Sequence, residues 1–371
     1  MQDLKHFFGE IEEKNIEFLD ILRDQNSSFR FNLTQEGLTE YGKKISLGFS
    51  CYALKLYFIL GYWEKLDQNI KSEWLNFIKK FQKNTENYEN NIFEDLNYIN
   101  GFNDIKLSKK IKNVTKISLN NLGFKKYLNH DQILKNSLRA ETKQAISSLY
   151  QVNEKNIFTY REYKDGDDQL LKYLNSLNWE NPWASGGQFS SLCVFSRINE
   201  DKVNSKILSE FSDKLVSKEN GAYYIGKTPN NTLLINGAMK IISGLDWIDK
   251  DIEYPNKLID LCLSIDPFNG GCDIVDLVYV IYKSQKNNKY KKKEIIDYLL
   301  NIIEKIETHY FDGTGGFSYF EKRCQTEYYG LKISKSLIQP DLHGTLLLVW
   351  ALSMISEIIE LDDYNWNILK P

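Results

Sequence analysis

Several stretches of this sequence are apolar almost all round when they are placed on a helix. A globular protein tolerates such helices only where they are packed on more than one side, so we expect them to be inner helices. They are SLGFSCYALKLYFILGY, NTLLINGAMKIISGL, CDIVDLVYVIY and HGTLLLVWALSMISEII.

Amphipathic helices lie between these apolar segments. In EIIDYLLNIIEKIE, apolar residues recur with helical spacing at Ile295, Leu299, Ile302 and Ile306, which predicts a single buried stripe. The alternation of one amphipathic and one apolar helix is typical of α/α-hairpin arrays. The amphipathic segments lie near 70–82, 167–178, 203–217, 254–264 and 292–307, and the apolar ones near 45–60, 185–198, 232–245, 272–284 and 342–358, with a further helix at 135–150.

The pattern predicts an all-α protein, an α/α-hairpin barrel or toroid of the (α/α)6 type with a central cavity. Strand signals are weak and no linker divides the chain, so we expect a single domain over residues 1–371. Residues 84–130 read as irregular, and 308–340 as a loop-rich insertion. In a closed ring the inner helices start at the same end, which would gather the preceding loops at one mouth of the cavity.

Composition and charge exclude several classes of protein. The 47 Lys and Arg residues against 50 Asp and Glu give a net charge of -3, which argues against nucleic acid as a partner. The sequence has no apolar stretch long enough to span a membrane and no signal peptide at its start. The 5 cysteines form no CxxC motif, which suits a reducing compartment, so we expect a cytoplasmic protein. The abundance of Lys, Asn and Ile fits an AT-rich bacterial coding sequence.

Two motifs resemble the repeats of the terpenoid cyclase and protein prenyltransferase superfamily. They are the outer-helix pattern from Trp74 to Gln82 and the DGxGGF loop from Asp312 to Phe317. The segment around His343, DLHGT before an apolar helix, is similar to the part of prenyltransferase β-subunits whose histidine binds zinc. The resemblance implies an α/α toroid with an active site in its central cavity and an isoprenoid substrate. A prenyltransferase β-subunit would also need a partner subunit, which this chain does not reveal.

The same resemblance implies a metal site at the head of the preceding inner helix. In the family an aspartate stands two residues before the cysteine ligand, but here that position is Gly270, so the carboxylate would come from Asp273 or Asp276. A class II terpene cyclase would need a DxDD motif, of which Asp273 and Asp276 supply only part.

The residues themselves allow this metal site and also other interpretations. Cys272 and Asp276 share a helix face, and with His343 they would supply the three ligands of an open zinc site. Alternatively, Cys272 is a small buried hydrophobe and His343 is satisfied by a loop. Without metal, Asp276, His343 and Asp341 are candidate acids and bases, although helix capping explains Asp341 equally well.

Further candidates concern substrate binding. Lys240, four residues after Asn236 on an apolar helix, needs a partner or a ligand if it is buried, or it reaches the mouth of the cavity. Gln188, Tyr223 and Tyr224 lie near the expected mouth, where polar tips beside aromatic faces suit sugars or phosphates, or they pack as ordinary loop residues. In the helix at 135–150, Arg139, Glu141 and Gln144 are expected to form a surface patch.

Three functions therefore stay open. The first is an enzyme of the cyclase or prenyltransferase type, with zinc or with acid–base groups. The second is a carbohydrate-active enzyme, a glycan lyase or hydrolase, because α/α toroids also serve such enzymes. The third is a non-catalytic helical scaffold.

Overall fold

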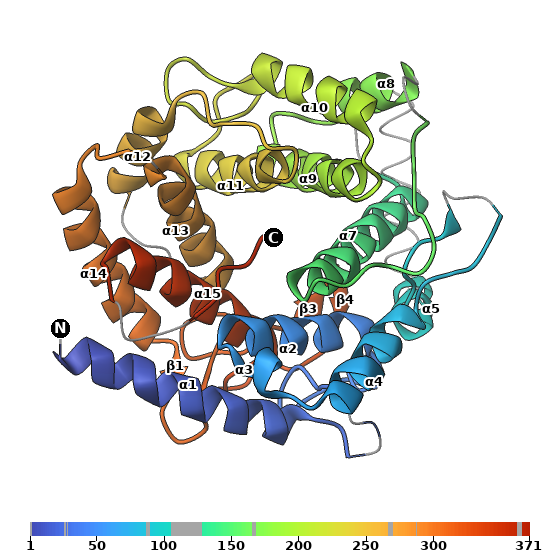
Figure 1. The fold of residues 1–371 in the computed structure, drawn as a ribbon, viewed down its shortest axis with the longest axis vertical. Coiled ribbons are helices and arrows are strands. Elements are labelled where there is room, and N and C mark those ends of the chain that lie inside the picture. Colours follow the sequence, from blue (N-terminus) through green and yellow to red (C-terminus); the bar gives the residue numbers. More distant parts are fainter. Residues whose placement is uncertain are drawn as a thin grey trace.

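The chain is mostly helical, as predicted, and its longest apolar helices contact one another in cyclic order. A computed structural model describes residues 2–25, 27, 29–86, 90–104, 128–164, 168–265, 270–286, 288–361 and 366–371. Among these, each of six helices packs on the next, and the last packs on the first (Figure 1). They are α2 (Leu47–Ile59), α7 (His130–Gln151), α9 (Pro182–Ile198), α11 (Asn231–Trp247), α13 (Gly271–Gln285) and α15 (Leu342–Ile358).

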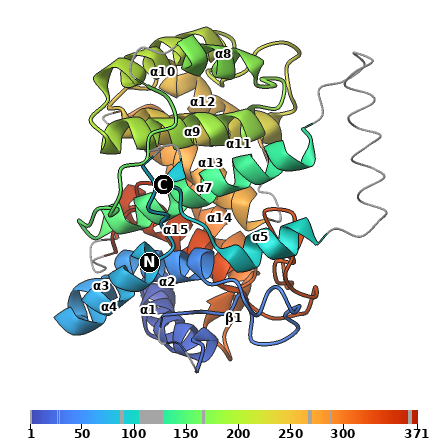
Figure 2. The ribbon, with the colours of Figure 1, turned by 90° about the vertical axis from the view of Figure 1, so that its right-hand side faces the viewer.

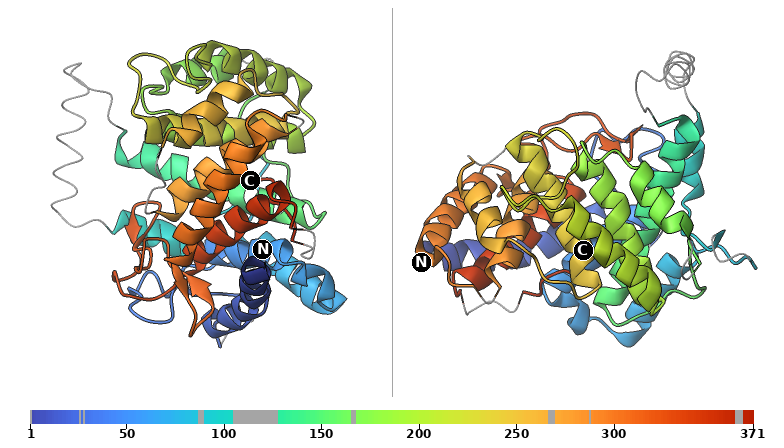
Figure 3. Two further views of the ribbon diagram at one scale, coloured as in Figure 1. Left: turned by 90° about the vertical axis from the view of Figure 1, so that its left-hand side faces the viewer. Right: turned by 90° about the horizontal axis from the view of Figure 1, so that it is seen from above.

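A second layer of helices covers the outside of these six. Here α10 packs on α9, α12 on α13, α14 on α15 and α13, α4 on α2, and α1 on α15 (Figures 2 and 3). The outer helices are α1 (Gln2–Leu22), α4 (Gln68–Lys79), α8 (Asp168–Ser176), α10 (Lys202–Leu215), α12 (Pro255–Leu263) and α14 (Lys292–Glu307), with the short α3 (Tyr62–Lys65) and α5 (Leu96–Asn103) beside them.

The burial of each layer follows the two sequence patterns. In α14, the predicted stripe of Ile295, Leu299, Ile302 and Ile306 is fully buried, whereas the rest of the helix is largely polar. Almost every residue of α15 is buried, because α13, α14, α2 and α1 surround it. For α14 and α15, periodicity alone therefore predicted which helix is covered on one side and which on several.

Glycines allow α9 and α11 to pack very closely. A Cβ atom added to Gly237 would lie 2.5 Å from the Cβ of Pro182, and one added to Gly244 would lie 3.0 Å from the Cα of Ser190. Both separations are shorter than real Cβ atoms normally accept, so side chains at these positions would force the helices apart.

Two small hairpins lie in the segment before α15. They are formed by β1 (Tyr310–Phe311) with β2 (Gly316–Phe317) and by β3 (Glu327–Tyr328) with β4 (Leu331–Lys332), both antiparallel. The turn of the first hairpin contains Gly315 at a φ of 77°, a conformation that favours glycine. The second hairpin belongs to residues 318–333, called the capping segment below.

The capping segment contacts α2, α13 and α15 near their N-terminal ends and α7 near its middle. The backbone N–H of Gly271 in α13 donates to the carbonyl of Tyr319 at 2.7 Å. The ring of Tyr328 lies 5.5 Å from that of Phe49 in α2, and its hydroxyl donates to Glu141 of α7. Gln325 of the capping segment also bonds to His343 of α15, so the segment covers part of one end of the ring, along four of its six helices.

Residues 366–371 cover the opposite end, where the C-terminus lies at the centre of the view in Figure 1. Gln151 at the end of α7 donates to the carbonyl of Lys370 at 2.8 Å, and Trp247 at the end of α11 donates to that of Pro371 at 2.6 Å. A segment of the chain therefore lies at each end of the ring.

The predicted irregular region can be judged only in part. Residues 90–104 contain the short α5, whereas residues 105–127 lie outside the described part of the chain. None of the described helices combines the length and the apolar character needed to cross a lipid bilayer.

Candidate functional site inside the ring

Five of the inner helices each contribute an ionisable side chain to one electrostatically linked group. These residues are Lys55 of α2, Lys143 of α7, Lys240 of α11, Asp276 of α13 and His343 of α15, and we call them the inner cluster. The charge of Lys240 acts on the pKa of both Lys143 and His343, although α7 and α15 each lie two places from α11 in the ring. Groups on helices so far apart can interact in this way only across the interior.

His343 is held by stacking and by one hydrogen bond. Its ring stacks on Tyr52 at 4.7 Å and on Tyr319 at 5.3 Å, and its Nδ1 lies 2.9 Å from Oε1 of Gln325. Because an amide oxygen only accepts, Nδ1 carries the proton and Nε2 has none. Burial, with the nearby lysine charges, lowers the pKa of His343 to about 3, so the imidazole is neutral at neutral pH.

Asp276 lies fully buried next to Lys240. Its Oδ1 is 3.5 Å from Nζ of Lys240, and apart from this ion pair neither carboxylate oxygen has a hydrogen-bond partner among the described residues. Burial raises the pKa of Asp276 to about 6 even though Lys240 opposes the shift. This carboxyl group can therefore take up or release a proton close to neutral pH.

The expected zinc ligands do not combine into a metal site. In the described part of the chain, no group of three His, Cys, Asp or Glu side chains is arranged to hold a metal ion. Asp276 faces the ammonium group of Lys240, and burial, with the charge of Asp276, raises the pKa of the Cys272 thiol to about 11. To bind here, zinc would have to displace Lys240 from Asp276 and the proton from the Cys272 thiol.

Asp341 orders the backbone at the start of α15. Its Oδ1 accepts from the N–H of Gly344 at 2.8 Å, and its Oδ2 accepts from those of Tyr319 at 2.7 Å and Gln325 at 3.0 Å. The side chain is fully buried, and these three bonds use both of its oxygens. Asp341 therefore holds the two residues of the capping segment that contact His343, which makes it a positioning residue.

Of the expected substrate-binding residues, Asn236 and Lys240 lie at the inner cluster. Asn236 donates from Nδ2 to Oδ1 of Asp273 at 2.7 Å and so joins α11 to α13. Gln188 instead accepts a hydrogen bond from Arg139.

The structure does not bring Tyr223 and Tyr224 to the inner cluster. Tyr223 pairs with Val216 just after the outer helix α10 and is buried there. The hydroxyl of Tyr224 lies 3.3 Å from that of Thr228 in the following loop. Both side chains take part in the packing of the outer layer.

The predicted surface patch on α7 is wrong. Arg139 is 2% exposed and Glu141 is 0% exposed, because α7 is an inner helix covered on several sides. Arg139 donates from Nε to Glu162 at 2.7 Å, and Glu141 accepts from the hydroxyl of Tyr328 at 2.9 Å. Burial, together with the charge of Asp95, raises the pKa of Glu141 to about 8, so this carboxyl group is neutral at pH 7.

Sequence reasoning missed Lys55 and Lys143. Lys55 interrupts an apolar helix in the same way as Lys240, which was a usable signal, whereas the helix around Lys143 was expected to carry a surface patch. Lys55 donates to Oγ of Ser147 at 3.2 Å, and burial lowers its pKa to about 8. Burial and the charges of Lys240 and Lys55 lower the pKa of Lys143 to about 7.

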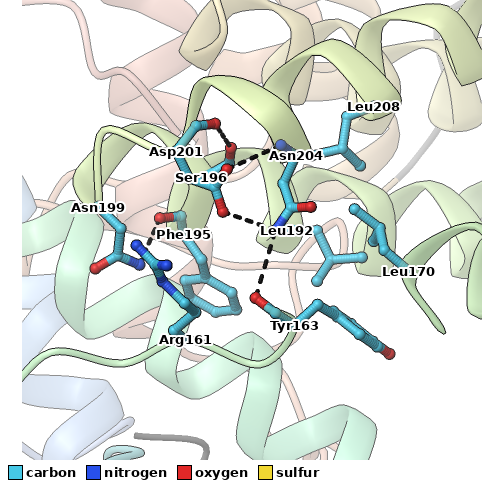
Figure 4. A pocket seen from close by; sticks show the side chains of 10 residues that line it. All are labelled: Arg161, Tyr163, Leu170, Leu192, Phe195, Ser196, Asn199, Asp201, Asn204 and Leu208. Atoms are coloured by element: carbon cyan, nitrogen blue, oxygen red, sulfur yellow. Dashed lines mark hydrogen bonds between the residues drawn. The ribbon is translucent and has the colours of Figure 1, made fainter. Parts of the chain in front are cut away.

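A small hollow outside the ring, between α8, α9 and α10, is also lined by polar groups (Figure 4). Asp201 accepts there from the backbone N–H of Asn204 at 2.9 Å and from its Nδ2 at 2.7 Å, whereas Asn204 Oδ1 has no partner among the described residues. The volume of ≈ 20 Å³ has room for about one water molecule, which would satisfy this oxygen. The hollow is too small for a substrate.

Comparison of the chain with models of protein families, with curated proteins and with solved structures finds no match. The resemblance to terpenoid cyclases and prenyltransferases therefore rests on the motifs in the sequence. Trp74 of the outer-helix motif is buried and donates from Nε1 to Oγ of Ser50 in α2 at 2.9 Å. The motif thus joins an outer helix to an inner one.

Proposed function

We propose that this protein is an enzyme with the α/α toroid architecture, (α/α)6 in type, and that its active site is the inner cluster. The cyclic contacts of six inner helices and the outer layer around them support the toroid. The partial exposure of Lys143, Lys240 and His343 supports a central cavity, because space must remain beside their side chains.

The observation that carries this proposal is one electrostatically linked group of five ionisable side chains from five different inner helices. A non-catalytic scaffold would fill its interior with apolar side chains, because each buried charge costs several kcal/mol unless it is well paired. Ionisable groups with strongly shifted pKa values that share one interior are typical of active sites.

The proposed chemistry is acid–base catalysis on a small molecule. Asp276, with a pKa of about 6, exchanges a proton near neutral pH, and the partly exposed Lys240 that pairs with it faces the substrate. The pKa of His343 is about 3, so its unprotonated Nε2 accepts a hydrogen bond from the substrate rather than a proton. Gln325 fixes the tautomer of His343, and the rings of Tyr52 and Tyr319 offer faces for the body of the substrate. The resemblance to terpenoid cyclases and prenyltransferases favours a cyclase-like or transferase-like reaction on an isoprenoid.

A carbohydrate-active enzyme, a glycan lyase or hydrolase, is the second candidate. The aromatic rings of Tyr52 and Tyr319 beside His343 favour it, because sugar rings stack on such faces. The chain across both ends of the ring disfavours a long polymer and favours a short oligosaccharide or a single small molecule.

The test is substrate profiling of the full chain. The wild type, Asp276→Asn and His343→Gln are incubated with an extract of small metabolites, with prenyl diphosphates and with a panel of oligosaccharides, and mass spectrometry follows the changes. We expect compounds that the wild type consumes and that both variants leave unchanged, while circular dichroism shows the variants to be folded. Equal turnover by all three proteins would show that the active site lies elsewhere. No turnover in any mixture would favour a non-catalytic helical scaffold.

A further inference from the structure

The inner cluster contains three amino groups, supplied by three different helices. Lys55 donates to Oγ of Ser147 at 3.2 Å, and Lys240 pairs with Asp276 at 3.5 Å. Lys143 stands one helical turn before Ser147 on α7, so it shares a face of that helix with the partner of Lys55. Lys143 itself has no hydrogen bond or ion pair among the described residues.

Positive charge dominates the surroundings of Lys143. The ionisable groups of the described residues that act on it are Lys240 and Lys55, which are basic, and the thiol of Cys193. The one carboxylate of the inner cluster, Asp276, already pairs with Lys240. An unpaired ammonium group beside two others is unfavourable in a protein interior unless an anion joins them.

We propose that Lys55, Lys143 and Lys240 bind the oxyanion group of a small molecule, a phosphate or a carboxylate, inside the ring. This inference rests on the proposed function, because it names the part of the substrate that the active site holds. Lysine ammonium groups are compact point charges with three donors each, which suits the oxygens of such a group. The anion replaces the missing partner of Lys143 and offsets the repulsion among the three amines.

The ends of the ring limit the size of this molecule. The capping segment lies at the N-terminal ends of α2, α13 and α15, and residues 366–371 lie at the C-terminal ends of α7 and α11. The oxyanion therefore belongs to a molecule that fits between these two segments. On one side of this space lie the rings of Tyr52 and Tyr319 around His343, where the uncharged body of the same molecule would sit.

Isothermal titration calorimetry of the full chain tests the proposal. Inorganic phosphate and sulfate form one set of probes, and citrate and acetate form the other, all at pH 6.5. The variants are Lys143→Met and Lys55→Met, and the control is Lys206→Met, whose side chain is 77% exposed. Methionine fills similar space without charge, and thermal melting checks that each variant is folded.

We expect the wild type and the control to bind at least one set of probes, and Lys143→Met to bind about tenfold or more weakly, as for the loss of a hydrogen bond to a charged group. Binding of phosphate and sulfate alone would assign a phosphoryl group, and binding of the second set alone would assign a carboxylate. No binding by the wild type, or equal binding by Lys143→Met, would overturn the proposal.

The same variants separate this inference from the proposed function. If Asp276→Asn abolishes turnover while Lys143→Met changes neither anion binding nor KM, the oxyanion site is refuted and the active site stands. If the lysine variants lose anion binding but substrate profiling finds no turnover, the oxyanion site stands and catalysis is refuted.

Discussion

Nζ of Lys240 lies 3.5 Å from Oδ1 of Asp276, and this ion pair joins α11 to α13 on the inner face of the ring. Only the lysine retains partial exposure, 24% of its side chain against 1% for the aspartate. The carboxylate therefore depends on the lysine for its charged form, whereas the lysine can still face a ligand.

Lys240→Met should destabilise the protein in a pH-dependent way. At pH 8 the variant leaves Asp276 ionised and unpaired, or forces it to take up a proton, which should lower the free energy of unfolding by about 3 kcal/mol. At pH 5 the buried carboxyl group is already mostly protonated, since its pKa is about 6 in the wild type, and the loss should be smaller. Urea denaturation at both pH values measures the two losses. Equal losses would show that the charge of Asp276 is not the cause.

Lys143→Met should be more stable than the wild type at pH 6, and the difference should shrink as the pH rises. In the folded protein the pKa of Lys143 is about 7, against 10.5 ordinarily, so between these values the unfolded chain binds more protons. The wild type therefore gains stability with rising pH in this window, by up to about 1.4 kcal/mol per pH unit. Unfolding of both proteins from pH 6 to 9, without added anion, measures the difference, and a constant difference would contradict the assigned surroundings of Lys143.

Glu141→Gln tests the buried carboxyl group of α7, whose effect on stability changes with pH in the opposite direction to that of Lys143. The pKa of Glu141 is about 8 in the folded protein and 4.5 ordinarily, so between these values the folded wild type holds a proton that the unfolded chain has lost. Wild-type stability from this group falls as the pH rises from 5 to 8, whereas glutamine keeps an acceptor for the Tyr328 hydroxyl and does not titrate. In denaturation experiments, the free energy of unfolding of the variant should rise relative to that of the wild type across this pH range. A flat difference would mean that Glu141 ionises normally.

Asp341→Asn should loosen the capping segment. The amide group keeps a single oxygen acceptor, so it cannot retain the bonds to Gly344, Tyr319 and Gln325 together, and we expect a loss of about 1–3 kcal/mol. Hydrogen exchange at the amides of Tyr319 and Gln325 should accelerate more than exchange in α14. Unchanged exchange at these two amides would contradict the positioning role.

The helices could be predicted from the sequence because their burial is periodic. The stripe of α14 and the all-round apolar character of α15 follow from how each helix packs, and both patterns are visible in a single sequence. The predicted helix at 135–150 was harder to interpret, because α7 carries buried polar residues such as Arg139 and Glu141 at positions that resemble a solvated face.

The inner cluster could be predicted only in part. Lys240 was found because it is a polar residue in an apolar helix, whereas Asp276 and His343 were singled out by the resemblance to prenyltransferase β-subunits. Lys143 could not be found, because nothing in a single helix reveals that its polar side faces other lysines across a ring. The partners of His343 were equally out of reach, since Tyr52 and Gln325 lie far from it in the sequence.

The most direct test of a ligand site inside the ring is a crystal structure of the full chain soaked in selenate, with anomalous data at the selenium edge. Selenate keeps the tetrahedral oxyanion form and marks its own position. We predict an anomalous peak within hydrogen-bond distance of Nζ of Lys143 that is absent from crystals of Lys143→Met. Selenate peaks confined to the outer surface, with none inside the ring, would contradict the account.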